Sequence, residues 1–412
     1  MKYLSLLLIS FTACVQPKNS PPPAPTSTTA FVFAANFGGG SELQAIDVKT
    51  REAGRVLGAD AISEDSLVRV FGEVLYIIGR EFNGTKNTLT VIDPKNGYAL
   101  ACPECQWALG EATNVQDFWA VSKTKAYMTT QPGLTTAPSY EHRNEVSVIN
   151  PTTGAITARI DIAAALLAAG DTLASEDPDG WHELGALYAD NEHLFVAISA
   201  LDSKSYFALY PTTGECGFVA GRVAVIDLDT DKVVKIIKLK GTNPAPSPAR
   251  WVPEPNTNNV LISTPGPFAP ASIEACGGVE RIDQVTLEHK GYLFTEQEIG
   301  GSVMSFDLDS KQNGVAFVFT NGDYLAPTYE IRRFTKSGLV AEPLLAPGPK
   351  AFTSASFVEV NDRGQAYIGL PLRAGTKIGM YETATGAELG AALATDLPPI
   401  DVAFFPGPAF SR

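Results

Sequence analysis

The sequence predicts an all-β protein in which a four-stranded antiparallel unit recurs about seven times along the chain. Three observations predict it: short apolar strands at regular spacing, turn residues between them, and few segments of helical periodicity. The clearest recurring segment alternates apolar and polar residues, ends in Asp or Asn, and turns through a stretch that often contains Gly. It occurs at 43–52, 89–97, 146–154, 223–232 and 378–386.

A second apolar strand precedes the Asp- or Asn-terminated segment of each unit. Its seven copies begin at Phe31, Val74, Lys125, His193, Asn259, Gly314 and Gln365. Before most copies, a further run leads into this strand through a polar or Gly-containing turn. With the strand after the tight turn, each unit is a meander of four strands, and units of roughly 50 residues are typical of propeller blades. We therefore predict a seven-bladed β-propeller.

The repeated segments resemble a known family. The strand FVFAANF at 31–37 and the segments of the form V-x-V-I-D-x-x-T/N-G are similar to the YVTN-type, YncE-like β-propeller repeats of bacteria. The resemblance covers nearly all of 31–412 and implies one propeller domain there. In units five and six DQVTLEHKG and YEIRRFTKSG replace the motif, so six or eight blades are the alternatives.

The order of the strands predicts how the ring closes. The chain begins with the second strand of a unit and ends, at Ile400–Phe405, with a first strand that has no followers. We expect this last strand to pair with Phe31–Ala35, so that the two ends of the chain complete one blade. Such pairing would remove two sheet edges that otherwise invite aggregation.

Residues 1–13 have the features of a secretory signal peptide, with a Lys near the start and an apolar run before Cys14. That run is shorter than the roughly 20 residues that span a bilayer, and no later charge-free stretch reaches this length, so no transmembrane helix is predicted. The stretch Phe11–Cys14 resembles the lipobox of bacterial lipoproteins, in which the Cys is lipidated; an ordinary cleaved signal is the alternative. Residues 14–30 then supply the lipid-attachment Cys and an extended Pro-rich linker. We expect an exported, lipid-anchored protein on the periplasmic or cell-surface side of a bacterial membrane.

Four further cysteines are disulfide candidates in such an oxidising compartment: Cys102, Cys105, Cys216 and Cys276. The pair Cys102 and Cys105 lies in a CxxC sequence, which we interpret as a structural loop disulfide. A redox CxxC would need a helix N-terminus to lower the thiol pKa, and a zinc site would need two more ligands. A bridge between Cys216 and Cys276 would join two neighbouring inserts.

Three long inserts follow the second strands of adjacent units, at 131–143, 200–221 and 265–281. Loops of this length are often functional, and these should stand on the same face of the ring as the connections between blades. The candidate binding residues on this face are Tyr140, Trp181, His182, Tyr206, Phe207, Tyr210 and Phe268. Packing of these side chains against the rim is the alternative to binding.

Three other features are interpreted structurally. The Ala- and Leu-rich segment 162–176 predicts a short helix or ordered excursion, because both residues favour helices. The pairs Asp227/Asp229 and Asp307/Asp309 fall at strand ends and are interpreted as caps of turns. Asp177-Pro178-Asp179-Gly180 is more typical of a turn than of a calcium loop, because the other ligands of such a loop are missing.

The composition limits the functions to consider. With 45 acidic and 31 basic residues the net charge is −14, which argues against a nucleic-acid partner. No Gly-x-Ser-x-Gly, His-Glu-x-x-His or phosphate-loop motif occurs, so no catalytic residue, metal or cofactor is predicted. We expect a monomeric, non-enzymatic binding or scaffold module of the bacterial cell envelope, whose partner is a protein, peptide or glycan. The alternative is a propeller enzyme with a central-channel site, such as a lactonase-like hydrolase or a quinone-dependent dehydrogenase.

Overall fold

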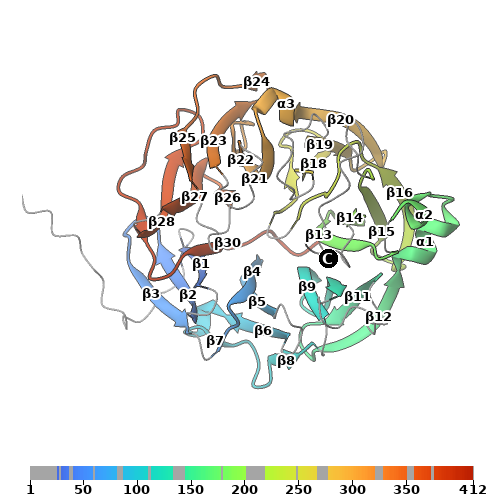
Figure 1. Cartoon of the computed structure of the whole chain (residues 1–412). Helices are drawn as coiled ribbons and strands as arrows, with labels where there is room; N and C mark the ends of the chain where they lie inside the picture. Colours follow the sequence, from blue (N-terminus) through green and yellow to red (C-terminus); the bar gives the residue numbers. More distant parts are fainter. Residues whose placement is uncertain are drawn as a thin grey trace, which may run out of the picture.

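Seven antiparallel sheets are arranged as blades around a central axis, which confirms the predicted seven-bladed β-propeller (Figure 1). The computed structural model describes Thr26 and residues 29–411, apart from 37–39, 59–60, 81–86, 110–112, 133–143, 178–179, 201–218, 247–248, 267–276, 321–327, 350–356 and 373–374. The seven sheets are counted within these residues. None of the helices there is long and apolar enough to cross a membrane.

Each of the first three blades contains a run of four hydrogen-bonded antiparallel strands that leads from the channel outward. Blade one consists of β30 (Pro399–Phe405), β1 (Thr29–Asn36), β2 (Gly40–Asp47) and β3 (Ala53–Leu57). Blade two consists of β4 (Asp65–Phe71), β5 (Val74–Arg80), β6 (Thr88–Asp93) and β7 (Ala99–Leu100), and β8 (Gln106–Ala108) also pairs with β6. Blade three consists of β9 (Thr113–Ser122), β10 (Lys125–Pro132), β11 (Glu145–Asn150) and β12 (Ala155–Asp161).

The other four blades repeat this order. Blade four consists of β13 (Glu183–Ala189), β14 (His193–Ser199), β15 (Arg222–Asp227) and β16 (Lys232–Lys238). Blade five consists of β17 (Val252–Pro253), β18 (Asn259–Thr264), β19 (Gly278–Asp283) and β20 (Glu288–Thr295). Blade six consists of β21 (Ser302–Leu308), β22 (Gly314–Phe319), β23 (Thr328–Thr335) and β24 (Gly338–Leu339), and β25 (Leu345–Pro349) also pairs with β23. Blade seven consists of β26 (Val358–Val360), β27 (Gln365–Leu372), β28 (Gly375–Glu382) and β29 (Leu393–Ala394).

The two ends of the chain complete blade one, as the strand order predicts. Strand β30 pairs antiparallel with β1, in a register that runs from Thr29 opposite Phe405 to Ala34 opposite Pro399. The rings of Phe31 and Phe405 meet edge to face, with their centroids 6.2 Å apart. Both side chains are buried, so ring closure is a packed junction as well as a hydrogen-bonded one.

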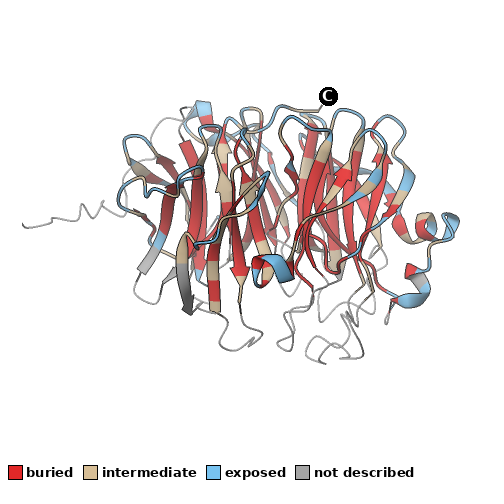
Figure 2. Cartoon of the chain, turned by 90° about the horizontal axis from the view of Figure 1, so that it is seen from above, coloured by how far each residue is buried: buried red, intermediate tan, exposed pale blue. Residues whose placement is uncertain are grey.

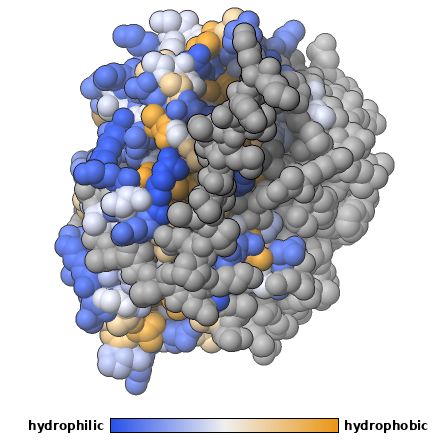
Figure 3. Space-filling view, turned by 90° about the vertical axis from the view of Figure 1, so that its left-hand side faces the viewer, coloured by the Kyte–Doolittle hydropathy of each residue, from blue (hydrophilic) through white to orange (hydrophobic). Residues whose placement is uncertain are grey.

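The hydrophobic core lies between the blades. Among the described residues there are seven apolar clusters, and each cluster combines side chains from two neighbouring blades. Figure 2 shows the blades as mostly buried strands joined by exposed turns. On the side that carries β3 and β28, the described surface is largely hydrophilic with scattered apolar residues (Figure 3). Each blade therefore buries its apolar faces only when both neighbours are in place.

The Asp or Asn that ends the repeated segment forms the turn into the outermost strand. In blades one, four and five, Asp47, Asp227 and Asp283 each accept hydrogen bonds from main-chain N–H groups two and three residues later. Asp283 ends VERID at 279–283, so blade five keeps the turn-forming Asp although the rest of its segment departs from the motif. The hydrogen bonds from Thr230 lower the pKa of Asp227.

The predicted helical segment between blades three and four is confirmed. It forms α1 (Ile162–Ala168) and α2 (Leu173–Glu176), which follow β12 directly. The carboxylate of Asp161 caps α1 by accepting a hydrogen bond from the N–H of Ala164 at 2.8 Å. Further short elements are η1 (Pro94–Asn96) and α3 (Glu296–Ile299).

Candidate ligand site at the channel mouth

A cavity of about 770 Å³ occupies one mouth of the central channel. Its walls come from the C-terminal ends of the innermost strands of all seven blades and from the turns that follow them. In a four-stranded meander these turns lie at the opposite end from the connections between blades. The cavity therefore opens on the face opposite the one for which the sequence predicts binding. Its volume falls within the roughly 300–1,000 Å³ of typical ligand pockets.

The C-terminal segment forms part of the cavity wall. Both views place the C-terminal end over the centre of the ring, on one face (Figures 1 and 2). Gly407 N–H donates to the carbonyl of Gly72 at 2.9 Å, and Gly72 N–H donates back to the carbonyl of Pro408 at 2.6 Å. A Cβ on Gly407 would lie 2.0 Å from the carbonyl oxygen of Val70, so this close approach requires glycine.

A network of ions crosses the floor of this mouth; Arg69, Asp117 and Asp401 are buried, and Arg250 and Glu359 are half-buried. Arg69 donates to Asp117 at 2.9 Å and to Asp401 at 2.9 Å. Arg250 donates to Asp401 at 2.6 Å, and its Nη1 lies 3.1 Å from a carboxylate oxygen of Glu359. These ion pairs join five parts of the ring near its axis. They are blades one, two, three and seven and the segment that leads into blade five.

The carboxylates also accept hydrogen bonds from main-chain N–H groups on the channel side of the innermost strands. Asp401 accepts a hydrogen bond from Val68 N–H at 3.0 Å, and Asp117 accepts one from Leu187 N–H at 2.8 Å. Asp307 accepts one from Val360 N–H at 2.6 Å. In each case a carboxylate of one blade binds the main chain of the next blade. An innermost strand has no partner strand on its channel side, and these bonds replace that partner.

The carboxyls outnumber the guanidiniums in this network. Two guanidiniums, Arg69 and Arg250, face four carboxyls. Among the described residues, Asp307 accepts hydrogen bonds from the main-chain N–H groups of Val360 and Leu308 and from no basic side chain. Burial raises the pKa of Asp307. Burial also raises the pKa of Glu359, and the neighbouring Asp307 raises it further against the opposing effect of Arg250. The buried Nε of Arg250 has no hydrogen-bond partner among the described residues.

Aromatic side chains line one side of the cavity. Phe71, Trp119, Tyr188 and Trp251 come from blades two to five and contact one another in turn. The centroid distances along this aromatic arc are 5.0, 5.4 and 6.4 Å. The indole N–H of Trp251 donates to the carbonyl of Ala186 at 2.9 Å, which fixes its ring between two blades. The mouth thus combines an apolar wall with a charged floor.

Trp181 and His182 lie at the start of blade four, away from the residues that line this cavity. Their exposed fractions are 5% and 2%. The His182 ring lies 2.9 Å from the carboxylate of Asp177, which also accepts a hydrogen bond from Gly180 N–H. In this conformation both side chains are packed into the protein, and a binding role for them stays a prediction.

The other residues predicted for binding or anchoring lie outside the described residues. They are Cys14, Tyr140, Tyr206, Phe207, Tyr210, Cys216, Phe268 and Cys276. The rim-loop interpretation and the bridge between Cys216 and Cys276 therefore remain predictions.

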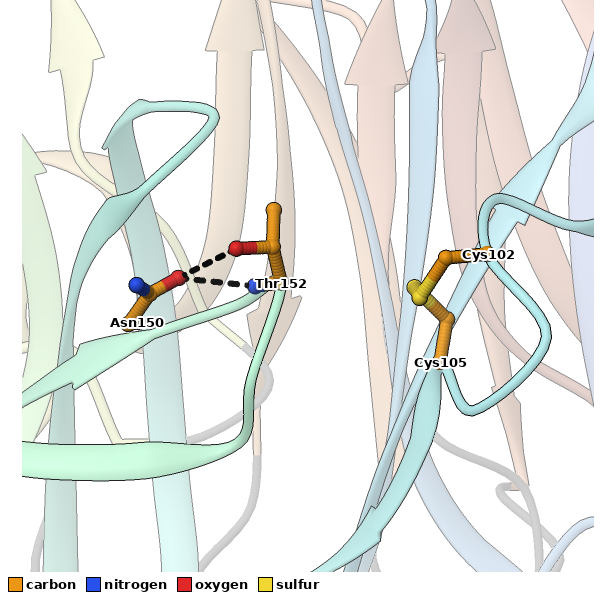
Figure 4. Close-up of a disulfide and its surroundings, with 4 residues drawn as sticks. All are labelled: Cys102, Cys105, Asn150 and Thr152. Carbon is orange, nitrogen blue, oxygen red and sulfur yellow. Dashed lines mark hydrogen bonds between the residues drawn. A yellow bond between two sulfur atoms is a disulfide. The ribbon is translucent and has the colours of Figure 1, made fainter.

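The predicted disulfide between Cys102 and Cys105 is present. It closes the loop between β7 and β8, and Figure 4 shows it beside the Asn150 turn of the next blade. Trp107 in β8 packs on that turn, where a Cβ at Gly154 would lie 2.2 Å from the indole Cγ. The disulfide lies within blade two, where it fixes the loop that leads to Trp107, and strands rather than a helix N-terminus flank the CxxC sequence.

One interpretation of a carboxylate was wrong. Asp309 does cap a turn, since it accepts a hydrogen bond from Lys311 N–H at 2.8 Å. Asp307 instead lies within β21, and its carboxylate faces the next blade at the cavity. The missed signal is a charge inside an otherwise apolar first strand. It occurs as Arg69 in LVRVF, Asp117 in VQDFW, Asp307 in MSFDL, Glu359 in FVEV and Asp401 in IDVAF.

The described residues contain no group of three or more His, Cys, Asp or Glu side chains that could hold a metal ion. What the mouth offers chemically is a sheltered volume, an aromatic wall and an excess of half-buried carboxyls over guanidiniums. These features suit recognition of a small molecule through charge and stacking.

No protein family model matches the chain, and no curated protein matches it. Among solved structures, the fold is similar to a putative 6-phosphogluconolactonase from Bacteroides uniformis, with a TM-score of 0.55, 11% identity and coverage of 92% of this chain and 100% of that one. It is also similar to a quinonprotein alcohol dehydrogenase-like protein from Bacteroides thetaiotaomicron, with a TM-score of 0.53, 10% identity and coverage of 92% and 78%. A dihydro-heme d1 dehydrogenase has a TM-score of 0.52 at 12% identity, with coverage of 96% and 78%. At these identities the similarity shows the β-propeller fold alone.

Proposed function

We propose that this protein is an exported, lipid-anchored β-propeller that acts as a non-enzymatic binding module of the bacterial cell envelope, with a ligand site in the channel-mouth cavity. The cavity of about 770 Å³ carries this proposal, because buried charged groups and aromatic rings from most blades converge on it. The signal-like N-terminus and the disulfide support export. The envelope protein, peptide or glycan expected at the long inserts is a separate proposal for the opposite face.

Binding is favoured over catalysis because the charged groups of the floor are already engaged with one another and with main-chain N–H groups. One observation favours an enzyme as the second candidate. Asp307 and Glu359 have raised pKa values in a cavity, and a carboxyl that holds its proton near neutral pH can act as a general acid. Among the structures with a similar fold are a putative lactonase and dehydrogenases, which keeps this alternative open without naming a reaction.

The site is tested by filling its mouth. Ala409 is exposed, lines the cavity and lies outside the ion network, so Ala409→Trp should narrow the opening without disturbing the fold. Purified wild-type protein and the variant are each incubated with a small-molecule extract of bacterial envelopes, washed, denatured and analysed by mass spectrometry. We expect compounds that the wild type retains and the variant loses at least in large part. Equal retention by both proteins would place binding elsewhere, and retention of nothing by either would refute the proposed site.

Export and anchoring are tested at Cys14. In a bacterial host, Cys14→Ser should move the protein from the membrane fraction to the soluble fraction and abolish labelling by a palmitate analogue, because the thiol carries the lipid. Cys102→Ser, which keeps Cys14, is the matched control and should remain anchored. Unchanged membrane association of the Cys14 variant would contradict the anchor.

A further inference from the structure

The floor of the channel-mouth cavity has a charge imbalance confined to one part of it. Arg69 is hydrogen-bonded to Asp117 and Asp401, so its positive charge is fully used. Arg250 is shared between Asp401 and Glu359. Asp307, on the adjacent blade six, has no basic side chain among its hydrogen-bond partners. Within this network the deficit of positive charge therefore falls at Asp307 and Glu359. Lys49, Asp362 and Arg363 also line the cavity, on the turns at its rim.

Those two carboxyls come from neighbouring blades and both line the cavity. Their interaction is unfavourable when both are ionised, and Asp307 raises the pKa of Glu359 for this reason. Buried carboxylates are stabilised either by taking up a proton or by pairing with a cation. A cation that enters the cavity would replace the missing positive charge.

The size and walls of the cavity decide what kind of cation fits. A volume of about 770 Å³ is far larger than a single metal ion needs and matches an organic molecule. The aromatic arc of Phe71, Trp119, Tyr188 and Trp251, in which Trp119 is the most exposed ring, gives the cavity an apolar wall against which an apolar or aromatic body can pack.

We infer that the cavity binds an organic cation, in which a protonated amine or amidine pairs with Asp307 and Glu359 and an apolar body rests among the aromatic side chains. This inference rests on the proposed function and adds the chemical class of its ligand.

The experiment compares charged probes with neutral molecules of the same shape. Tyramine is paired with tyrosol, which has a hydroxyl in place of the ammonium, and benzamidine is paired with benzamide. Binding to the purified full chain is measured by calorimetry at pH 7.5. We expect at least one cation to bind about tenfold or more tightly than its neutral partner, since a charge-assisted hydrogen bond contributes that much or more.

Variants assign the effect to the two carboxyls. The double variant Asp307→Asn/Glu359→Gln should lose the preference for the cation while keeping the affinity for the neutral molecules. The matched control Glu388→Gln/Asp396→Asn removes the same number of negative charges from exposed positions on the outer part of blade seven and should keep the preference. Circular dichroism establishes that both variants are folded.

Three results would overturn the inference. The cations and their neutral partners could bind equally, no probe could bind, or Ca²⁺ rather than an amine could bind in a way that depends on Asp307 and Glu359. If the wild type retains compounds from the envelope extract and the Ala409→Trp variant does not, any of these three results would refute the cationic ligand class and leave the proposed site intact. If that experiment also fails, the site itself is refuted.

Discussion

Replacing Asp401 with Asn is expected to lower the free energy of unfolding by about 3–5 kcal/mol, the range for removing one partner of a buried ion pair. Asp401 is 1% exposed and accepts hydrogen bonds from Arg69, Arg250 and Val68 N–H. The amide would present N–H donors to a guanidinium that also donates, and two buried cations would lose their shared counter-ion. From typical unfolding entropies per residue, the melting temperature should fall by roughly 4–6 °C.

Asp396→Asn is the matched control for this prediction, because it makes the same substitution at an exposed position five residues earlier. Surface substitutions of this kind usually change stability by less than about 0.5 kcal/mol. Urea denaturation, followed by tryptophan fluorescence, measures both variants. A loss below about 1 kcal/mol for Asp401→Asn would mean that the carboxylate is not the counter-ion on which the centre of the ring depends.

Ending the chain at Pro398 should abolish cooperative folding. The shortened chain lacks β30, so β1 would expose a free edge together with Phe31 and Phe33, which are both 0% exposed in the closed ring. It would also lack Asp401 and its bonds to blade two. We expect no cooperative thermal transition and elution as aggregates in size-exclusion chromatography, because an exposed apolar edge strand recruits further chains.

A chain that ends at Phe405 distinguishes the effect of losing strand β30 from the effect of losing the segment 406–412 that follows it. This control keeps β30 and lacks only the part that contacts Gly72 at the cavity wall, so it should fold as a monomer. A synthetic peptide of residues 399–412, added during refolding of the chain that ends at Pro398, should restore the transition by supplying the missing strand. A cooperative transition at the wild-type temperature without β30 would contradict closure by strand pairing.

The fold could be predicted because local chemistry repeats. Asp47, Asp227 and Asp283 form the same kind of turn at the same place in their blades, and each turn needs only residues adjacent in the sequence. Ring closure followed from counting strands, because a chain that starts at a second strand must finish with a first one. The disulfide between Cys102 and Cys105 was predictable for the same local reason.

The candidate site could not be predicted in this way, because its residues meet only when the ring closes. Arg69 and Asp401 are 332 positions apart, and their distance of 2.9 Å depends on which blades become neighbours. Asp307 was mistaken for a turn cap because another Asp follows two residues later and does cap a turn. A charge within an apolar first strand was the available signal, since a buried charge requires a partner.

The pairing of β30 with β1 also has a consequence for biogenesis. Blade one receives its innermost strand from β30, which is synthesised after the strands of the six other blades. A ribosome or a translocation pore that still holds β30 keeps it from pairing with β1. Closure of the ring must therefore wait until β30 is free, and a chain threaded through a secretion channel would close its ring on the far side of the membrane.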